Sequence, residues 1–192
     1  MRGLVDHLPV TQDGVTVRQL RHADAAAFAA GTKDPQVRRY GHLPLSDYTP
    51  EIVLNQIDGI IAEGMAAGTL AVLAIADAAS EMFLGSIVLF DIRGDRAEVG
   101  FWLTPDARGR GAARSALVAI ARLAADAGIP HLDARTVVDN AGSRRVLEGA
   151  GFRQVGGAST DTAPSGETVV SVKFECDPIQ VSSCSHNPSP TE

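Results

Sequence analysis

Glycine and arginine gather in one short segment that has the residue types of an anion site. It reads Arg-Gly-Arg-Gly-Ala-Ala from Arg108 to Ala113, after an expected strand that ends at Leu103. The residues that follow have helical periodicity, and the first amides of a helix lack intrahelical acceptors and carry partial positive charge. Glycines let an anion approach the backbone closely. The segment therefore predicts a phosphate site flanked by arginine charge.

Several nucleotide-binding turns resemble this segment in part. A P-loop needs Gly-Lys-Ser/Thr at the end of the turn, which is missing here. A dinucleotide-binding turn places its glycines directly after the strand and a third glycine where Arg114 stands, but Thr104 to Arg108 intervene. A cradle for the pyrophosphate of coenzyme A and a glycine-rich loop without a ligand both remain open at this point.

A second polar segment begins the helix expected over 140–150. Asn140 stands at the expected N-cap, where asparagine is favoured for structural reasons alone. Ser143 is three residues further on, so both side chains lie on one helix face. Capping and ligand contact are both open for Asn140, and one side chain can do both.

Taken together, these segments resemble the GNAT acetyltransferase superfamily. More narrowly, they are similar to the branch that acetylates the N-terminal alanine or serine of ribosomal proteins and includes many small-amine acetyltransferases. The resemblance runs from about Val15 to Phe174. The motifs that carry it are Arg108-x-x-Gly111-x-Ala113, Asn140-x-x-Ser143-x-x-x-Leu147-x-x-x-Gly151-Phe152, Asp34-Pro35-x-Val37-Arg38-Arg39-Tyr40 and Glu98-x-Gly100-Phe101-Trp102.

The resemblance implies an α/β fold with a single mixed, mostly antiparallel, splayed central sheet and helices on both faces. Acetyl-CoA would be the co-substrate, and it would enter the gap between the strand ending at Leu103 and the strand ending near Val138. Backbone groups near Leu103 would bind the pantetheine. The expected cofactor-binding residues are Leu103, Thr104, Arg108, Gly109, Arg110, Gly111, Ala112, Ala113, Asn140, Ser143 and Arg145.

The same resemblance implies N-acetylation of a primary amine by direct attack in a ternary complex. Glu98 is the expected general base, unless it is simply a charged residue on the sheet rim. An acceptor amine is protonated at pH 7, and a carboxylate can take its proton directly or through one water. Related enzymes often have a tyrosine nearby that protonates the leaving thiolate, but this segment has none, so Ser143 or an ordered water is the expected general acid. Ser143 is also a candidate hydrogen-bond donor to the cofactor. Tyr40, His42 and Trp102 are expected in the acceptor pocket. The alternative is a non-catalytic acyl-CoA-binding or sensing module.

The elements that must position these residues follow from hydrophobic periodicity. The stretch 93–96 predicts a tight turn between two antiparallel strands, and Asp24 is expected to cap the first helix. The helix over 50–68 is expected to turn Ile60 toward the core. Strands are expected over 15–20, 69–76, 83–92, 97–103, 131–138, 153–157 and 167–174, and helices over 24–28, within 34–41, and over 50–68, 105–127 and 140–150.

Composition narrows the class of protein. The 192 residues carry 17 Lys and Arg against 23 Asp and Glu, so general nucleic-acid binding is not expected. Cys176 and Cys184 both lie near the C-terminus, which predicts no disulfide framework, no zinc site and a reducing, cytoplasmic location. No membrane span is expected. One domain is predicted over 14–176, with an N-terminal extension over 1–13, a disordered tail over 177–192, and a possible homodimer through the last strands.

Overall fold

The computed structural model of the chain describes residues 3–179 and 181. The strands of this part form one mixed sheet in the order β1-β2-β3-β4-β5-β6-β8-β7. All neighbouring strands are antiparallel except β5 and β6, which confirms the mixed, mostly antiparallel sheet. The strands are β1 (Val10–Gln12), β2 (Val15–Gln19), β3 (Ala71–Asp77), β4 (Phe83–Arg93), β5 (Arg96–Leu103), β6 (His131–Val137), β7 (Arg153–Thr162) and β8 (Thr168–Cys176).

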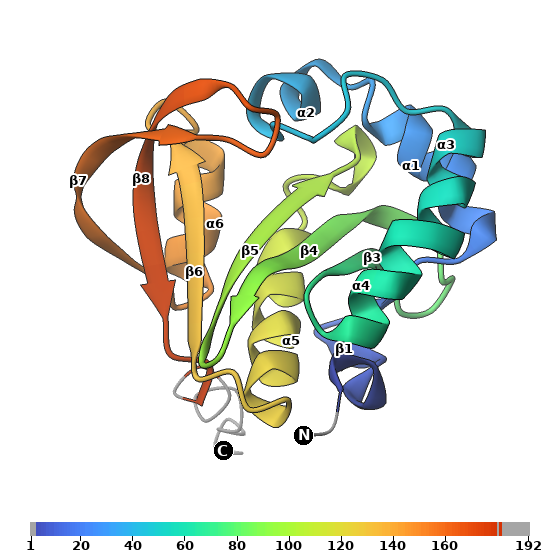
Figure 1. Cartoon of the computed structure of the whole chain (residues 1–192), viewed down its shortest axis with the longest axis horizontal. Coiled ribbons are helices and arrows are strands. Elements are labelled where there is room, and N and C mark those ends of the chain that lie inside the picture. Colours follow the sequence, from blue (N-terminus) through green and yellow to red (C-terminus); the bar gives the residue numbers. More distant parts are fainter. Residues whose placement is uncertain (1–2, 180, 182–192) are drawn as a thin grey trace, which may run out of the picture.

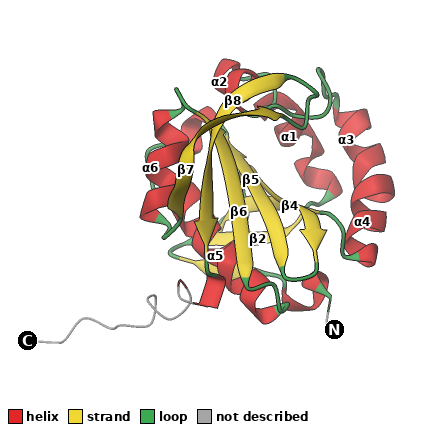
Figure 2. Cartoon of the chain, turned by 60° about the vertical axis from the view of Figure 1, so that its left-hand side comes forward, coloured by secondary structure: helices red, strands yellow, loops and turns green. Residues whose placement is uncertain are grey.

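Helices cover both faces of this sheet, as expected. Figure 2 shows α6 on one side of the sheet and α1, α3 and α4 on the other, and α5 contacts α6. The α-helices are α1 (Ala25–Gly31), α2 (Pro35–Tyr40), α3 (Pro50–Gln56), α4 (Ala62–Ala67), α5 (Ala112–Asp126) and α6 (Ala141–Gly149). Short 3-10 turns are η1 (Leu4–His7), η2 (His22–Asp24) and η4 (Pro105–Ala107), and η3 (Ile57–Ile61) is a π-helical segment.

The sheet splits open between β5 and β6. These two strands pair at three positions only, the last of which is Glu98 with Asp133. Beyond that pair they diverge, whereas β6 pairs with β8 from Leu132 to Val137. In Figure 1 the two strands meet at one end and separate toward α2. The opening expected between them is therefore present.

Helix α5 packs against the part of the sheet that contains β1, β2 and β3. Its Leu117, Ile120 and Leu123 are fully buried. Burying each such side chain contributes roughly 1.5–3 kcal/mol relative to exposure. Its buried alanines allow close approach to β1 and β2, against which the helix packs. The helix that carries the glycine turn is thus held rigidly by the core.

The expected cap of α1 by Asp24 is wrong. The Asp24 carboxylate instead accepts hydrogen bonds from two nitrogens of Arg18 (2.7 and 3.0 Å) and from the Arg21 amide (2.8 Å). Arg18 and Asp24 are both buried, and a buried guanidinium requires a charged partner. Neutralising Arg18 takes precedence over capping, and α1 begins without a side-chain cap.

The single helix expected over 50–68 is also interrupted. Residues Ile57–Ile61 form a π-helical segment, and Gly59 has non-helical dihedral angles. A π-turn adds a residue and rotates the following side chains relative to the 3.6-residue period. Ile60, expected in the core, is consequently 60% exposed. Of the two glycines that could end this helix, Gly64 and Gly68, it is Gly68 that does so, as the C-cap of α4 with φ +68°.

Other boundaries differ by local extensions. The helix expected from 105 begins at Ala112, after a 3-10 turn and the glycine segment. β7 continues to Thr162, beyond the expected end at 157. Within the expected N-terminal extension, η1 contacts α5 and β1 pairs with β2. Most of the expected tail over 177–192 lies outside the described residues.

Candidate active site

A cavity of about 790 Å³ lies in the opening between β5 and β6. This volume is within the range of sites that enclose small molecules. Its walls come from the diverging ends of β5 and β6, from the first turns of α5 and α6, and from the segment around α2. The two segments that the sequence singled out therefore contribute to one cavity.

The edge of β5 that faces this cavity has no partner strand among the described residues beyond Glu98. The Thr104 amide donates to the Leu84 carbonyl on β4 (2.8 Å), so alternate residues before it also direct their backbone groups to β4. Val99, Phe101 and Leu103 then turn their backbone groups toward β6. The Glu98–Asp133 pair uses the Val99 amide, so the groups that face the gap are the Val99 carbonyl and the amides and carbonyls of Phe101 and Leu103. An extended ligand with amide groups can add to this edge in the manner of a strand.

The glycine turn beside this edge has the geometry of an anion cradle. Gly109 and Gly111 have φ of +74° and +81°, which glycine adopts without strain. A Cβ built on either residue would meet no heavy atom within 4 Å, so the space over the turn is open. Gly111 is the N-cap of α5 and provides no side-chain cap. The first amides of α5 are therefore available to phosphate oxygens.

Arg108 does not add free charge to this cradle. Its guanidinium donates to the Asp34 carboxylate (2.5 Å) and to the Leu103 carbonyl (2.9 Å). Asp34 also accepts from the amides of Gln36 and Val37 and so caps α2. The Arg108 guanidinium holds the pKa of Asp34 below its usual value. This contact joins the glycine turn to the segment that covers the other side of the cavity.

On the opposite lip, Asn140 caps α6 by accepting from the Ser143 amide (3.0 Å). Both residues also line the cavity. Ser143 is half-buried, and its hydroxyl remains to interact with a ligand. Asn140 thus has the structural role that its residue type favours, at a position that a ligand can also reach.

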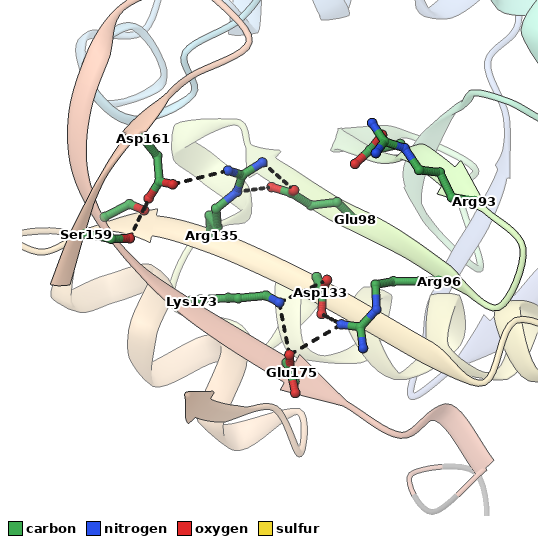
Figure 3. A network of polar contacts seen from close by, with 11 residues as sticks. Arg93, Arg96, Glu98, Asp133, Arg135, Ser159, Asp161, Lys173 and Glu175 are labelled. Atoms are coloured by element: carbon green, nitrogen blue, oxygen red, sulfur yellow. Dashed lines mark hydrogen bonds and ion pairs between the residues drawn. The ribbon is translucent and has the colours of Figure 1, made fainter. Parts of the chain in front are cut away.

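Glu98 lies at the point where β5 and β6 diverge, and its carboxylate is paired. Arg135 on β6 donates from Nε to Oε1 (3.0 Å) and from Nη2 to Oε2 (2.6 Å). The contact with Glu98 raises the pKa of Arg135. Behind Arg135 lies Asp161 on β7, at 3.5 Å from Nη1 (Figure 3). The hydroxyls of Ser171 and Ser159 lower the pKa of Asp161.

The three residues expected in the acceptor pocket all line the cavity, with different surroundings. Trp102 is 8% exposed and packs edge-on against Phe28 and Phe83, so it forms a wall. Tyr40 is half-buried beneath the guanidinium of Arg39. His42 has φ +45°, and its Nδ1 lies 3.1 Å from Oε2 of Glu167 in the β7–β8 hairpin. That contact joins the loop after α2, which carries His42, to the β7–β8 hairpin, which carries Glu167.

Twelve of the fifteen residues expected in the site line this cavity. Thr104, Arg110 and Arg145 do not line it. Thr104 directs its hydroxyl and its amide to the Leu84 carbonyl, while Arg110 and Arg145 are exposed. The residues brought together are Tyr40, His42, Glu98, Trp102, Leu103, Arg108, Gly109, Gly111, Ala112, Ala113, Asn140 and Ser143.

Sequence reasoning missed four charged residues of the site: Asp34, Arg135, Asp161 and Glu167. The Asp-Pro pair at Asp34 signals a cap but not its contact with Arg108. Arg135 alternates with buried neighbours on β6, which indicates only that it faces away from the core. Asp161 lies in the part of β7 beyond the expected end at 157.

The described part of the chain has neither a metal-binding cluster nor a membrane-spanning helix. It contains no group of three or more His, Cys, Asp or Glu residues placed to hold a metal ion. It also contains no helix with the length and apolar character needed to cross a bilayer.

The splayed sheet and the glycine cradle define the acyl-CoA N-acyltransferase fold. A family comparison agrees, because residues 15–153 match the family described as acetyltransferase (GNAT) domain. The chain therefore belongs to the GNAT acetyltransferases and is an acyltransferase. A search of curated proteins gives no match.

Solved structures share this fold at low sequence identity. RimJ of Mycobacterium smegmatis, in complex with CoA-disulfide, superposes with a TM-score of 0.76 at 19% identity, covering 90% of this chain and 87% of that one. The ribosomal-protein-S5-alanine acetyltransferase of Vibrio fischeri gives 0.73 at 16% identity, covering 89% and 97%. The spermidine N-acetyltransferase of Vibrio cholerae, in complex with CoA and spermine, gives 0.72 at 14% identity, covering 88% and 98%.

Proposed function

We propose that the protein transfers an acetyl group from acetyl-CoA to the nitrogen of a primary amine. The observation that carries this proposal is the continuity of the unpaired β5 edge with the open glycine turn at the start of α5. The edge suits the amide groups of pantetheine, and the turn suits the pyrophosphate. The amides from Gly109 to Ala113 would hold the pyrophosphate, and Asn140 and Ser143 would contact the cofactor from the opposite lip. Arg110 and Arg145, which are exposed, would meet its outer phosphates.

The proposed reaction is direct transfer in a ternary complex. The acceptor enters as an ammonium and must lose a proton before its nitrogen can attack the thioester carbonyl. Glu98 takes that proton, through one water, and a backbone amide on the open β5 edge binds the developing oxyanion. The thiolate then leaves and takes a proton from Ser143 or from water. The buried Cys176 thiol has its pKa raised to about 12 by burial and does not line the cavity, so no acyl-enzyme is invoked.

The acceptor is an amine that reaches the cavity between α2 and the β7–β8 hairpin. The related structures include an enzyme named for a ribosomal-protein alanine and one named for spermidine. By analogy, the two acceptor classes to screen are protein N-termini that begin with alanine or serine, and small polyamines. The apolar wall formed by Trp102 and the bridge between His42 and Glu167 restrict the entrance to either.

Calorimetric titration with acetyl-CoA tests the cofactor site. Wild-type protein is expected to bind with a Kd around micromolar, about −8 kcal/mol. Gly111→Glu places bulk and negative charge over the turn, and binding should disappear. Gly156→Glu is the matched control, because Gly156 is exposed on β7, has a positive φ (+71°) as Gly111 does, and a Cβ there also meets open space. Circular dichroism must show that both variants are folded. Equal binding by wild type and Gly111→Glu contradicts the cradle.

The catalytic role is tested on the same protein with Glu98→Gln. Acetylation of spermidine and of an alanine-initiated peptide is followed by thiol release and by mass spectrometry. We expect a loss of turnover of about 10²-fold, the lower range for removing a general base. Acetyl-CoA binding should be retained. Binding without acetylation of any amine by the wild type would instead favour an acyl-CoA-sensing module.

A further inference from the structure

The residue that fixes Glu98 comes from the opposite lip of the opening. Glu98 is the last β5 residue paired with β6, and its partner there is Asp133. Arg135 is two residues further along β6 and therefore on the same face of the sheet. Its side chain crosses the opening diagonally at the position where backbone pairing stops, as Figure 3 shows.

The contact leaves Glu98 able to accept a further proton or hydrogen bond. Nε and Nη2 of Arg135 bind one oxygen each, as a two-pronged pair. An ionised carboxylate offers about four lone-pair sites, so roughly one remains on each oxygen. The pair thus fixes the orientation of the carboxylate without occupying all of its acceptor sites. The Glu98 side chain is only 12% exposed, so solvent competes weakly for it.

Arg135 also contacts a second carboxylate, that of Asp161, through the nitrogen that does not bind Glu98. Nη1 lies 3.5 Å from Oδ1 of Asp161, whose other oxygen accepts from Ser159 (2.8 Å) and Ser171 (2.6 Å). These hydroxyls come from β7 and β8, which are antiparallel partners. A continuous polar chain therefore runs from the β7–β8 hairpin through Arg135 to Glu98.

We infer that Arg135, held by Asp161, is a positioning residue that orients the Glu98 carboxylate toward the acceptor nitrogen. This inference rests on the proposed function, in which Glu98 is the base. A misplacement of a base by about 1 Å can cost about 10²-fold in rate. The β6 side chain is needed because, on the side of the opening, β5 has no paired strand beyond Glu98 among the described residues.

A neighbouring ion-pair network provides a matched control. Arg96 on β5 binds Asp133 (2.6 Å) and Glu175 (3.3 Å), and Lys173 bridges the same two carboxylates. Figure 3 shows this network beside the Glu98 network, and both join β5 to β6. None of its residues lines the cavity. Arg96→Gln therefore removes an arginine from a similar network without touching the site.

Steady-state kinetics with acetyl-CoA and the acceptor probes, spermidine and an alanine-initiated peptide, form the first arm of the test. Arg135→Gln should lower kcat by about 10- to 100-fold and leave KM for acetyl-CoA within about twofold. Arg135→Lys should recover part of the loss, because it keeps the charge but not the two-pronged geometry. Arg96→Gln should keep kcat within about twofold of the wild type. A kcat for Arg135→Gln equal to that of Arg96→Gln overturns the inference.

The double variant separates this inference from the proposed function. If Arg135 acts through Glu98, Arg135→Gln in a Glu98→Gln background should cost less than about threefold, because the group to be positioned is gone. A full additional loss there means that Arg135 acts otherwise, and the inference fails alone. Wild-type turnover by Glu98→Gln itself refutes the assignment of the base and, with it, the role of Arg135.

A spectroscopic arm needs no acceptor. The Arg135 Nε–H signal in a ¹H–¹⁵N spectrum of the full chain is assigned by its loss in Arg135→Lys. It should shift in Glu98→Gln, which replaces the Nε acceptor, and in Asp161→Asn, while Arg96→Gln leaves it in place. A signal that does not move in Glu98→Gln overturns the inference, because the contact would not exist in solution.

Discussion

The buried pair between Arg18 and Asp24 gives the sharpest test of what holds the N-terminal half together. The two side chains are 7% and 6% exposed, and the pair ties β2 to the start of α1. Asp24→Ala leaves a guanidinium buried without its counter-ion, which typically costs about 3–5 kcal/mol. Arg18 keeps two carbonyl acceptors, Gln19 at 3.0 Å and Glu81 at 3.1 Å. The cost should therefore fall near the lower limit, about 3 kcal/mol.

For a chain of this length, each kcal/mol shifts the melting temperature by roughly 2–4 °C. Asp24→Ala should accordingly melt about 6–12 °C below the wild type when unfolding is followed by circular dichroism. The control is Glu81→Gln, which breaks an exposed contact between the side chains of Arg21 and Glu81. That variant should melt almost where the wild type does, because water screens exposed ion pairs.

A double variant, Asp24→Ala with Arg18→Met, checks the cause. Removing both charges removes the uncompensated one, and an apolar side chain of similar length fills the site. The double variant should recover at least about half of the lost melting temperature. If it melts below Asp24→Ala, or if Asp24→Ala melts no lower than Glu81→Gln, the uncompensated charge of Arg18 is not the main cause of the destabilisation and the reasoning is refuted.

Two further predictions concern the walls of the site. A Cβ on Gly31 would lie 2.5 Å from the indole of Trp102, so Gly31→Ala should displace the single tryptophan and shift its fluorescence emission, at a cost in stability of about 1–3 kcal/mol. The Gly157→Ala control should leave the emission unchanged. Unchanged emission in Gly31→Ala as well would show that the packing around Trp102 accommodates the added methyl group. Because Arg108 lowers the pKa of Asp34, that carboxyl stabilises the fold above its unfolded pKa of about 4, and this contribution is lost as pH falls through the lower folded value. When the pH is lowered from about 6 to about 3, the urea concentration at the midpoint of unfolding should therefore decrease less in Asp34→Asn than in the wild type. Equal decreases would contradict this prediction.

The parts of the site that the sequence could predict are those in which neighbours in sequence are neighbours in space. The glycine turn needs only a strand, two residues with positive φ and a helix, all within Leu103 to Ala113. The Asn140 cap is equally local, since its partner is three residues away. Elements bounded by glycines, such as the end of α4 at Gly68, were predictable for the same reason.

The parts that could not be predicted depend on lateral neighbours. Arg135 and Glu98 are 37 residues apart, and their contact depends on the register of one parallel strand pair. Periodicity states which face of β6 Arg135 occupies but not which strand lies beside it. Asp24 failed in the same way, because the charge that binds it lies on a separate strand. The π-helical segment around Gly59 was not predicted, because the apolar residues on either side of it keep an ordinary helical period.

The opening is best understood as an incomplete sheet. β6 gives one edge to β8 along its length, while its pairing with β5 stops at Glu98. From that residue onward, the backbone groups of β5 on this side require another partner, since an unpaired polar group in a half-buried wall is costly. Arg108 donates a hydrogen bond to the Leu103 carbonyl, and Arg135 binds the Glu98 carboxylate at the point where β5 and β6 diverge. The Val99 carbonyl and the amide and carbonyl of Phe101 remain for a ligand. The same feature that weakens the sheet is therefore suited to bind an extended, amide-bearing cofactor.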